Sequence, residues 1–313
     1  MKPRQIQSLT DAPAMQLGRV GIVLLADPTG SSSTKSAQNN DRRAYYVSYI
    51  GILGAGYVGE TLARRLGSLG HTVRVANSRG PETLGRLASV QNVQPVWASQ
   101  ITEGADIVIS AVNETLVADM DSDLTGSLAQ VPIVIDAANY NSRRDGDVPD
   151  LLAGKPVGQW LSEQLGRPLF RVFNNIEAHV LAAGGRPAGD AGRIALPISG
   201  PNGSHLARVH TLVDELGFDP VYNGELTESW RHQLGTKSYC TDLQAPQLRI
   251  ELAEASQEQT LEENQIAYFL GEDVRTSLSL GADIMRNQTQ RLQEYFGPEF
   301  GDPRVNAERL GSN

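Results

Sequence analysis

The chain has 313 residues, of which 40% are hydrophobic and 20% charged, and its formal net charge at pH 7 is −9. This acidic balance argues against broad binding to nucleic acid, and the apolar run at residues 20–26 is too short to span a bilayer. The single cysteine, Cys240, excludes an internal disulfide and a cysteine-based metal cluster, and the histidines show no metal-ligand spacing, so we expect a cytoplasmic protein that binds no metal.

The first 46 residues differ from the rest of the chain. The stretch "DPTGSSSTKSAQNNDRR" consists of turn formers and polar residues and offers almost nothing to bury. Ordering such a segment would recover little free energy for the entropy lost. We therefore predict that residues 1–46 form a disordered extension.

An alternation of short apolar runs and amphipathic stretches begins at residue 47. The apolar runs predict strands over residues 47–53, 72–76, 94–97, 107–112, 133–137, 169–173, 194–198 and 220–222. Nearly continuous apolar strands alternating with helices are typical of a parallel sheet covered on both faces. The prediction is an α/β fold with a doubly wound, mostly parallel Rossmann-type sheet over residues 47–223.

The strands stop after Gly224. Two stretches, "QLRIELAEASQEQTLEENQIAYFLG" and "RTSLSLGADIMRNQTQRLQEYF", carry apolar residues at helical spacing. We predict a helical C-terminal region over residues 224–313, which packs on the sheet as a cap or forms the face of a homodimer.

A glycine-rich motif follows the first predicted strand and opens the first predicted helix. It is G-x-G-x-x-G, formed by Gly54, Gly56 and Gly59, with Tyr57 and Val58 between the last two. In that context the first glycine permits a tight turn, the second a close approach of a pyrophosphate, and the third close helix packing. The motif predicts a dinucleotide site at the helix N-terminus.

The end of the second predicted strand indicates which dinucleotide is bound. Sites for NAD keep a carboxylate there for the ribose 2′-hydroxyl, whereas this chain has Asn77, Ser78 and Arg79. Arginine offers paired donors to a phosphate and serine adds a hydroxyl. We predict NADP(H) as the cofactor.

Further strand ends should border the same crevice. These positions place Ala111, Val112 and Asn139 beside the cofactor. Asp136 lies at one of these ends too, and we expect it to cap a turn rather than to act in catalysis.

The chain resembles the NADP-dependent oxidoreductases related to the reductase that links NADP to the deazaflavin coenzyme F420. The resemblance rests on "IGILGAGYVGETLARRL", "VANSRGPETL", "ADIVISAV" and "FNNIEAHVLAAGGRPAGDAGRIALPISG" and covers most of residues 47–240. It implies that Ser78 and Arg79 hold the 2′-phosphate and that Asn174, Asn175 and Ile176 lie near the nicotinamide. The deazaflavin enzymes carry a histidine where this chain has Asn174, so the resemblance leaves the second reactant open.

Hydride transfer between two bound coenzymes mainly requires alignment, so we assign no catalytic residue. Lys155 and Lys237 would suit a hydroxy-acid acceptor by residue type alone. His179 lies close to the predicted crevice. The last group comprises Trp230, Arg231 and Tyr239, which either line the acceptor pocket or pack as a linker on the helical region.

The sequence thus predicts an NADP(H)-dependent oxidoreductase that passes hydride to or from a small-molecule acceptor or a second coenzyme, such as a deazaflavin or flavin. One alternative is an imine or pyrroline-carboxylate reductase, although "EASQEQTLEENQ" is more polar than the dimer core of such enzymes. The other alternative is a non-catalytic NADP-binding sensor that lacks open space over the nicotinamide.

Overall fold

The computed structural model of the chain describes residues 46–261 and 289–300. The chain divides into two units, Met1–Val47 and Ser48–Asn313, and the second is described below. Apart from Tyr46, the segment predicted to be disordered, residues 1–46, lies outside the described residues.

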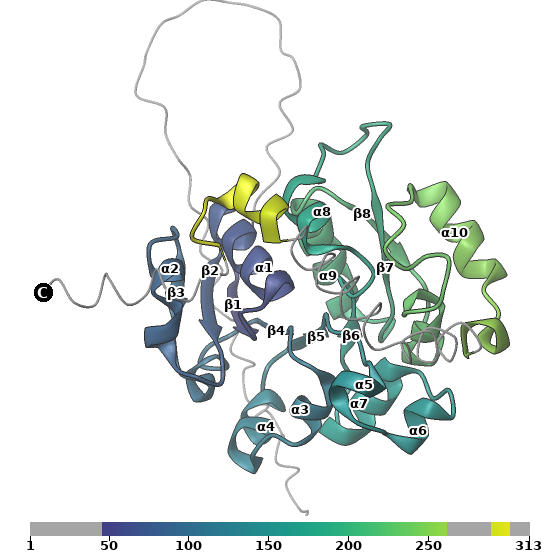
Figure 1. Cartoon of the computed structure of the whole chain (residues 1–313), viewed down its shortest axis with the longest axis horizontal. Helices are drawn as coiled ribbons and strands as arrows, with labels where there is room; N and C mark the ends of the chain where they lie inside the picture. Colours follow the sequence, from purple (N-terminus) through teal and green to yellow (C-terminus); the bar gives the residue numbers. More distant parts are fainter. Residues whose placement is uncertain (1–45, 262–288, 301–313) are drawn as a thin grey trace, which may run out of the picture. The chain divides into compact units, whose positions relative to one another are not determined.

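A parallel six-stranded sheet forms the centre of the second unit, in the order β3-β2-β1-β4-β5-β6 (Figure 1). Its strands are β1 (Tyr49–Leu53), β2 (Thr72–Ala76), β3 (Val93–Pro95), β4 (Ile107–Ser110), β5 (Ile133–Asp136) and β6 (Phe170–Arg171). β1 pairs with β2 on one side and with β4 on the other, so the strand order reverses between β1 and β4. This arrangement confirms the predicted doubly wound α/β fold.

Helices lie between these strands and after them in the chain. The longer ones are α1 (Tyr57–Ser68), α4 (Ser122–Leu128), α7 (Val157–Leu165), α9 (Ser204–Glu215) and α10 (Ala245–Glu254). The shorter ones are α2 (Gly85–Ala88), α3 (Glu114–Ala118), α5 (Ser142–Asp145), α6 (Pro149–Leu152) and α8 (Ala178–Ala183), with 3-10 turns η1 (Pro81–Leu84), η2 (Ala98–Gln100) and η3 (Leu226–His232).

The alternation of side chains along the strands builds two cores, one on each face of the sheet. Ile107 and Ile109 of β4 belong to the core that includes residues of α1, α8 and α9. Val108, between them, faces the opposite core with residues of α3, α4 and α7. Because both faces are covered, the strands are apolar at almost every position, as the sequence predicted.

A second, two-stranded sheet continues the fold. It consists of β7 (Ala195–Ile198) and β8 (Asp219–Tyr222), which run parallel to each other. An antiparallel bridge between Arg171 and Ser199 joins it to β6. β6 is therefore flanked by β5 on one side and by the end of β7 on the other.

The described chain after Tyr222 is helical or irregular, in agreement with the predicted C-terminal region. It contains η3, α10 and a helix over residues 289–296, while residues 262–288 lie outside the described part. None of the helices in the described part of the chain is both long and apolar enough to cross a membrane.

The predicted strand over residues 169–173 is shorter in the structure, because the backbone turns at its end. Phe173 has φ +69° although it carries a large, fully buried side chain. A left-handed conformation at a bulky residue is uncommon and ends the strand geometry. The chain therefore leaves β6 sharply, just before Asn174.

Candidate functional site

The carboxyl ends of the parallel strands meet along one edge of the sheet. Backbone bonds align these ends, with 2.8 Å from the Gly54 nitrogen to the Ala76 oxygen and 2.8 Å from the Ala111 nitrogen to the Leu53 oxygen. Dinucleotides bind outside this edge, at the point where the strand order reverses. The structure therefore brings the loops after β1, β2, β4, β5 and β6 around one candidate crevice.

The three glycines of the first loop have three different local roles. Gly54 has φ +100°, and a Cβ there would meet the Ala111 carbonyl oxygen at 2.7 Å. A Cβ on Gly59 would overlap the carbonyl oxygen of Gly54, whereas one on Gly56 would meet nothing within 4 Å. The open space at Gly56 lies at the N-terminus of α1, where no side chain caps the helix. Backbone N–H groups at that position can receive the phosphates of a dinucleotide.

The turn after β2 holds the Asn77 side chain within it and exposes the next two side chains. The Asn77 Oδ1 accepts a bond from the Arg79 nitrogen at 3.0 Å, and its Nδ2 donates to the Thr83 Oγ1 at 2.8 Å. Ser78 and Arg79 are exposed. Gly80, at φ +96°, closes the turn. Asn77 thus shapes the turn, while Ser78 and Arg79 are the side chains available to a ligand there.

The loop after β4 borders the glycine loop. A Cβ on Gly54 would meet the Val112 Cγ1 at 2.6 Å, and Ala111 and Val112 are both half-buried. These two positions therefore stand beside the first loop, as expected for residues that contact a dinucleotide. That contact stays a prediction.

A buried ion cluster lies beneath the ends of β4, β5 and β6. It consists of Glu114, Asp136 and Arg171, whose side chains are fully buried. The Arg171 Nη1 pairs with the Asp136 Oδ2 and lies 3.4 Å from the Glu114 Oε1. Asp136 also accepts a bond from the Ala138 nitrogen at 3.2 Å, which is the turn-capping contact that we expected.

Burial disfavours charge on the carboxyls of this cluster. Loss of solvent raises the pKa of Glu114 to about 8, and the nearby Asp136 adds to the rise while Arg171 opposes it. Burial also raises the pKa of Asp136, against the opposing effect of Arg171. A Glu114 carboxyl with a pKa of about 8 keeps its proton near neutral pH, and the closest ion-pair partner of Arg171 is Asp136.

A hydrogen-bonded network continues from the cluster toward the crevice. The Arg171 Nη2 donates to the Asn139 Oδ1 at 3.3 Å, and the Asn139 Nδ2 donates to the Asn174 backbone oxygen at 2.6 Å. Asn174 is held in turn by His232, through its Oδ1 at 3.0 Å from the His232 Nδ1 and through its Nδ2 at 2.9 Å from the His232 oxygen. Burial lowers the pKa of His232 to about 3, so its ring is neutral.

Tyr239 and Cys240 form the far side of this network. The Tyr239 hydroxyl lies 3.5 Å from the Asn139 Nδ2, and burial raises the pKa of Tyr239. Burial also raises the pKa of the Cys240 thiol to about 12, which keeps it protonated. The Cys240 nitrogen donates to the Asn175 oxygen at 2.8 Å. The segment after η3 is thereby fastened to the segment after β6.

The predicted pocket residues separate into different environments. Asn174, Asn175 and Ile176 are buried, Tyr239 is half-buried, and His179 is half-buried beside the Glu177 carboxylate and the Arg291 guanidinium.

Trp230 and Arg231 agree with the alternative that this stretch packs on the helical region. Trp230 is buried, and the Arg231 guanidinium lies over its ring at 4.4 Å and donates to the Leu252 oxygen of α10 at 3.1 Å. Whether any of the predicted pocket residues contacts an acceptor stays a prediction.

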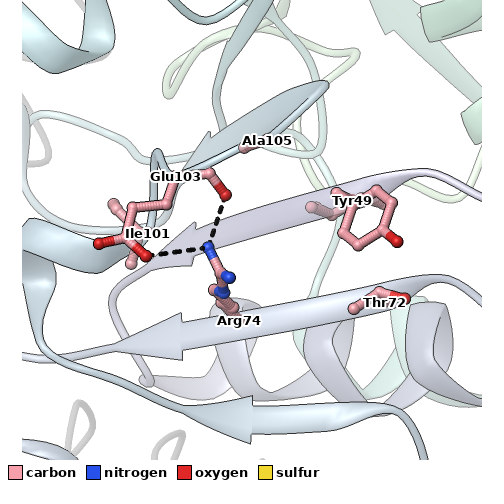
Figure 2. A pocket seen from close by; sticks show the side chains of 7 residues that line it. Tyr49, Thr72, Arg74, Ile101, Glu103 and Ala105 are labelled. Atoms are coloured by element: carbon pink, nitrogen blue, oxygen red, sulfur yellow. Dashed lines mark hydrogen bonds and ion pairs between the residues drawn. The ribbon is translucent and has the colours of Figure 1, made fainter. Parts of the chain in front are cut away.

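The hollow drawn in Figure 2 lies at the opposite edge of the sheet. It is bordered by Tyr49 and Thr72, which begin β1 and β2, and by Arg74. The Arg74 guanidinium turns toward the Glu103 loop and donates to the Glu103 backbone oxygen at 2.5 Å (Figure 2). The Arg74 guanidinium is thus paired within the protein, and the hollow is separate from the candidate site at the carboxyl ends.

Sequence reasoning did not single out Arg171, Glu114 or His232 for the site. One signal was present, because "LFRVF" places an arginine inside an otherwise apolar strand. Charged residues in that setting are buried only when paired. Its charged partners come from β5 and from α3, and no local pattern connects them to Arg171.

Comparison with known proteins shows which family this chain is similar to. The model of the family described as "NADP oxidoreductase coenzyme F420-dependent" matches residues 49–140. A hypothetical protein, SMa0349 from Sinorhizobium meliloti, is 30% identical, with a TM-score of 0.53, and the match covers 63% of this chain and 96% of that one. A protein of Arthrobacter sp. FB24, provisionally described as an F420-dependent NADP reductase, is 26% identical over 58% of this chain and 87% of its own, with a TM-score of 0.49.

A curated relative matches over a shorter stretch. The Escherichia coli (strain K12) protein YjhV is 44% identical over 59 residues, which are 19% of this chain and 43% of that protein. The chain thus matches less than half of the length of this relative.

Proposed function

Because the chain belongs to the family of coenzyme F420-dependent NADP oxidoreductases, we propose that it transfers a hydride between NADP(H) and a second redox partner of the deazaflavin or flavin type. Membership of this family supports an NADP-dependent oxidoreductase activity for the chain. The identity of the second partner, a small molecule or a second coenzyme, is the part that goes beyond the family.

The observation that carries the choice of cofactor is the turn after β2. Ser78 and Arg79 are exposed at the end of the strand, beside a glycine loop whose middle glycine leaves open space. A guanidinium can donate two parallel bonds to a phosphate, and a hydroxyl adds a third. A phosphate at the ribose 2′-position would be stabilised there, whereas the carboxylate of an NAD site would repel it.

The residues of the crevice would then bind and align the cofactor. When bound, NADP(H) supplies the hydride or accepts it at the nicotinamide. The glycine loop and the N-terminus of α1 would hold the diphosphate, and Ser78 with Arg79 the 2′-phosphate. Ala111, Val112 and Asn139 would line the part of the crevice that follows the strand reversal.

Replacing Arg79 tests the cofactor assignment. Arg79→Ala removes a charge-assisted bond worth on the order of 1.5–3 kcal/mol, which corresponds to roughly ten- to hundred-fold weaker binding of NADPH. NADH has no 2′-phosphate, so its affinity should stay within about two-fold. Parallel calorimetric titrations with both nucleotides measure the difference. Ser78→Ala should act in the same direction to a smaller extent, since it removes a neutral donor.

Arg74, which lies within β2, provides a matched control for Arg79. Its guanidinium contacts the Glu103 loop at the opposite edge of the sheet, so Arg74→Ala should leave both affinities unchanged. Equal losses of NADPH and NADH binding in Arg79→Ala would show that Arg79 supports the shared part of the cofactor or the fold. The NADP assignment would then fail.

The acceptor is identified by following NADPH oxidation in the presence of candidate acceptors. We expect oxidation with a deazaflavin or a flavin, and none that depends on an imine. Turnover with an imine alone would favour the imine-reductase alternative. Tight NADPH binding without turnover on deazaflavin, flavin, ferric or imine acceptors would favour a sensor and contradict the proposed activity.

A further inference from the structure

The network that begins at Arg171 ends in two side chains that are partly exposed. Arg171, Asn174 and His232 are buried, whereas Asn139 and Tyr239 are only half-buried. The Asn139 Nδ2 lies 3.5 Å from the Tyr239 hydroxyl. These two side chains therefore form the part of the network that a ligand in the crevice can reach. We refer to them as the Asn139–Tyr239 edge.

A structural role explains the presence of Arg171 poorly. The two carboxyls around it are fully buried, and taking such groups out of water usually costs about as much as their attraction returns. Within the described residues, the Glu114 Oε2 and the Arg171 Nε have no hydrogen-bond partner. An apolar side chain in β6 would avoid these costs. The cation lies at the carboxyl end of β6, and buried charges of this kind are commonly found at functional sites.

The contacts of Arg171 fix the direction in which the Asn139 amide points. The Asn139 Oδ1 receives the Arg171 Nη2 and the Asn174 Nδ2, each at 3.3 Å. Its oxygen is thereby turned inward, and its Nδ2 is directed to the Asn174 backbone oxygen and toward the Tyr239 hydroxyl. Arg171 is thus one of two donors that keep the amide from exchanging its oxygen with its nitrogen.

The neighbouring backbone supports the same arrangement. Phe173 is held at φ +69° directly before Asn174, and unfavourable backbone conformations at buried residues persist only where their surroundings enforce them. His232 fixes both ends of the Asn174 side chain, and the Ser199 Oγ lies 3.0 Å from the His232 Nε2. Several elements therefore converge to hold one asparagine pair rigidly.

We propose that Arg171 is a positioning residue of the cofactor site, which holds Asn139 so that the Asn139–Tyr239 edge receives the nicotinamide half of NADP(H). This inference rests on the proposed function. The edge lies after β5 and η3, on the side of the strand reversal that accommodates the second nucleotide of a dinucleotide. The first nucleotide, with its 2′-phosphate, belongs to the other side.

The affinities for two ligands test the two halves of the cofactor site separately. NADPH contains the nicotinamide, and adenosine 2′,5′-bisphosphate carries the adenosine 2′-phosphate without it. Asn139→Ala and Arg171→Lys should each weaken NADPH binding by roughly three- to ten-fold, the value of one hydrogen bond, and leave the bisphosphate within about two-fold. A merely structural role would weaken both ligands together.

A double-mutant cycle shows whether Arg171 acts through Asn139. If it does, Arg171→Lys should have no further effect on NADPH affinity once Asn139→Ala is present. Arg193→Lys serves as the control, because Arg193 is also buried and paired, with Asp214 at 2.8 Å and Asp219 at 2.7 Å, but lies before β7 and away from the crevice. It should leave the ratio of the two affinities unchanged.

Several results would overturn the proposal. Additive effects of Arg171→Lys and Asn139→Ala would do so, and so would equal losses for NADPH and the bisphosphate. If Arg171→Lys does not fold, Asn139→Ala alone decides, since an unchanged NADPH affinity in that variant would also overturn the proposal. A wild-type protein that binds neither ligand would refute the proposed function itself. An unchanged ratio of the two affinities in the variants would refute only the role of Arg171 and Asn139.

Discussion

The residues of the glycine loop differ in what a side chain would meet. At Gly59 a Cβ would overlap the Gly54 carbonyl, so the fold itself requires glycine there. At Gly56 a Cβ would meet nothing within 4 Å, so the fold alone does not explain this glycine. Gly56 also has an extended backbone that any residue can adopt. The proposed dinucleotide, whose diphosphate would approach the backbone closely, would account for it.

Gly56→Val follows from this difference between the glycines. The variant should fold with a melting temperature close to that of the wild type, because the new side chain enters open space. NADPH and NADH should both bind at least about ten-fold more weakly, since the side chain occupies the position of the diphosphate that they share. Thermal unfolding and calorimetry check the two halves of this expectation. Wild-type NADPH affinity in the folded variant would refute the assignment of the phosphate loop.

The same residues show what the sequence could and could not predict. The spacing of Gly54, Gly56 and Gly59 after an apolar run was sufficient to predict the loop, because the geometry is local. Arg171 was visible as a cation in an apolar strand, yet its partners Glu114 and Asp136 are 57 and 35 positions away. Such contacts depend on the order of the strands in the sheet, which a single sequence pattern does not contain.

At the scale of elements, the segment of residues 289–300 packs on the helices that flank the glycine loop. Phe300 and Leu292 are buried with Ala178 and Ala182 of α8, and the Phe300 ring stacks on Tyr57 of α1 with 6.4 Å between centroids. The Tyr57 hydroxyl lies 2.6 Å from the Thr289 Oγ1. The predicted helical region thus includes a part that covers the start of α1.

Phe300→Ala should release this segment. Loss of a buried phenylalanine costs about 3–5 kcal/mol, and a segment that is not part of the sheet can open without unfolding it. Amide exchange over residues 289–296 should therefore accelerate while exchange in β1 and β4 stays slow. Tyr295→Ala is the control, because Tyr295 is 54% exposed. Unchanged exchange over residues 289–296 in Phe300→Ala would contradict the observed packing.

Strand positions were predicted well, and strand ends less so. The bounds of β2 agree with the prediction at both ends, because its apolar run stops at the polar Asn77. The predicted strand over residues 169–173 continues past β6, because an apolar run does not reveal where the backbone turns at Phe173. Hydrophobicity records burial, and burial extends beyond the hydrogen-bonded part of a strand.

At the scale of the whole molecule, two buried groups link the free energy of unfolding to pH in opposite directions. Glu114 keeps its proton in the folded state up to about pH 8, whereas the same carboxyl in the unfolded chain releases it near the ordinary glutamate pKa of 4.5. Its contribution to stability is therefore lost as pH rises through this window. His232, with a folded pKa of about 3 against an ordinary value of 6.5, does not take up the proton that the unfolded chain binds, so its contribution is lost as pH falls.

The two slopes overlap between about pH 4.5 and 6.5, so the loss due to Glu114 should be clearest above that range. Glu114→Gln removes this titration, and its stability relative to the wild type should rise steadily from pH 6 to pH 8 in urea-unfolding measurements. Glu163→Gln is the control: the exposed Glu163 carboxyl has its pKa lowered by its hydrogen bond to Lys155, so it titrates below this range. Parallel stability curves for Glu114→Gln and the wild type between pH 6 and pH 8 would show that Glu114 is ionised in the folded protein. The Glu114 carboxylate would then add a negative charge to the buried ion cluster around Arg171.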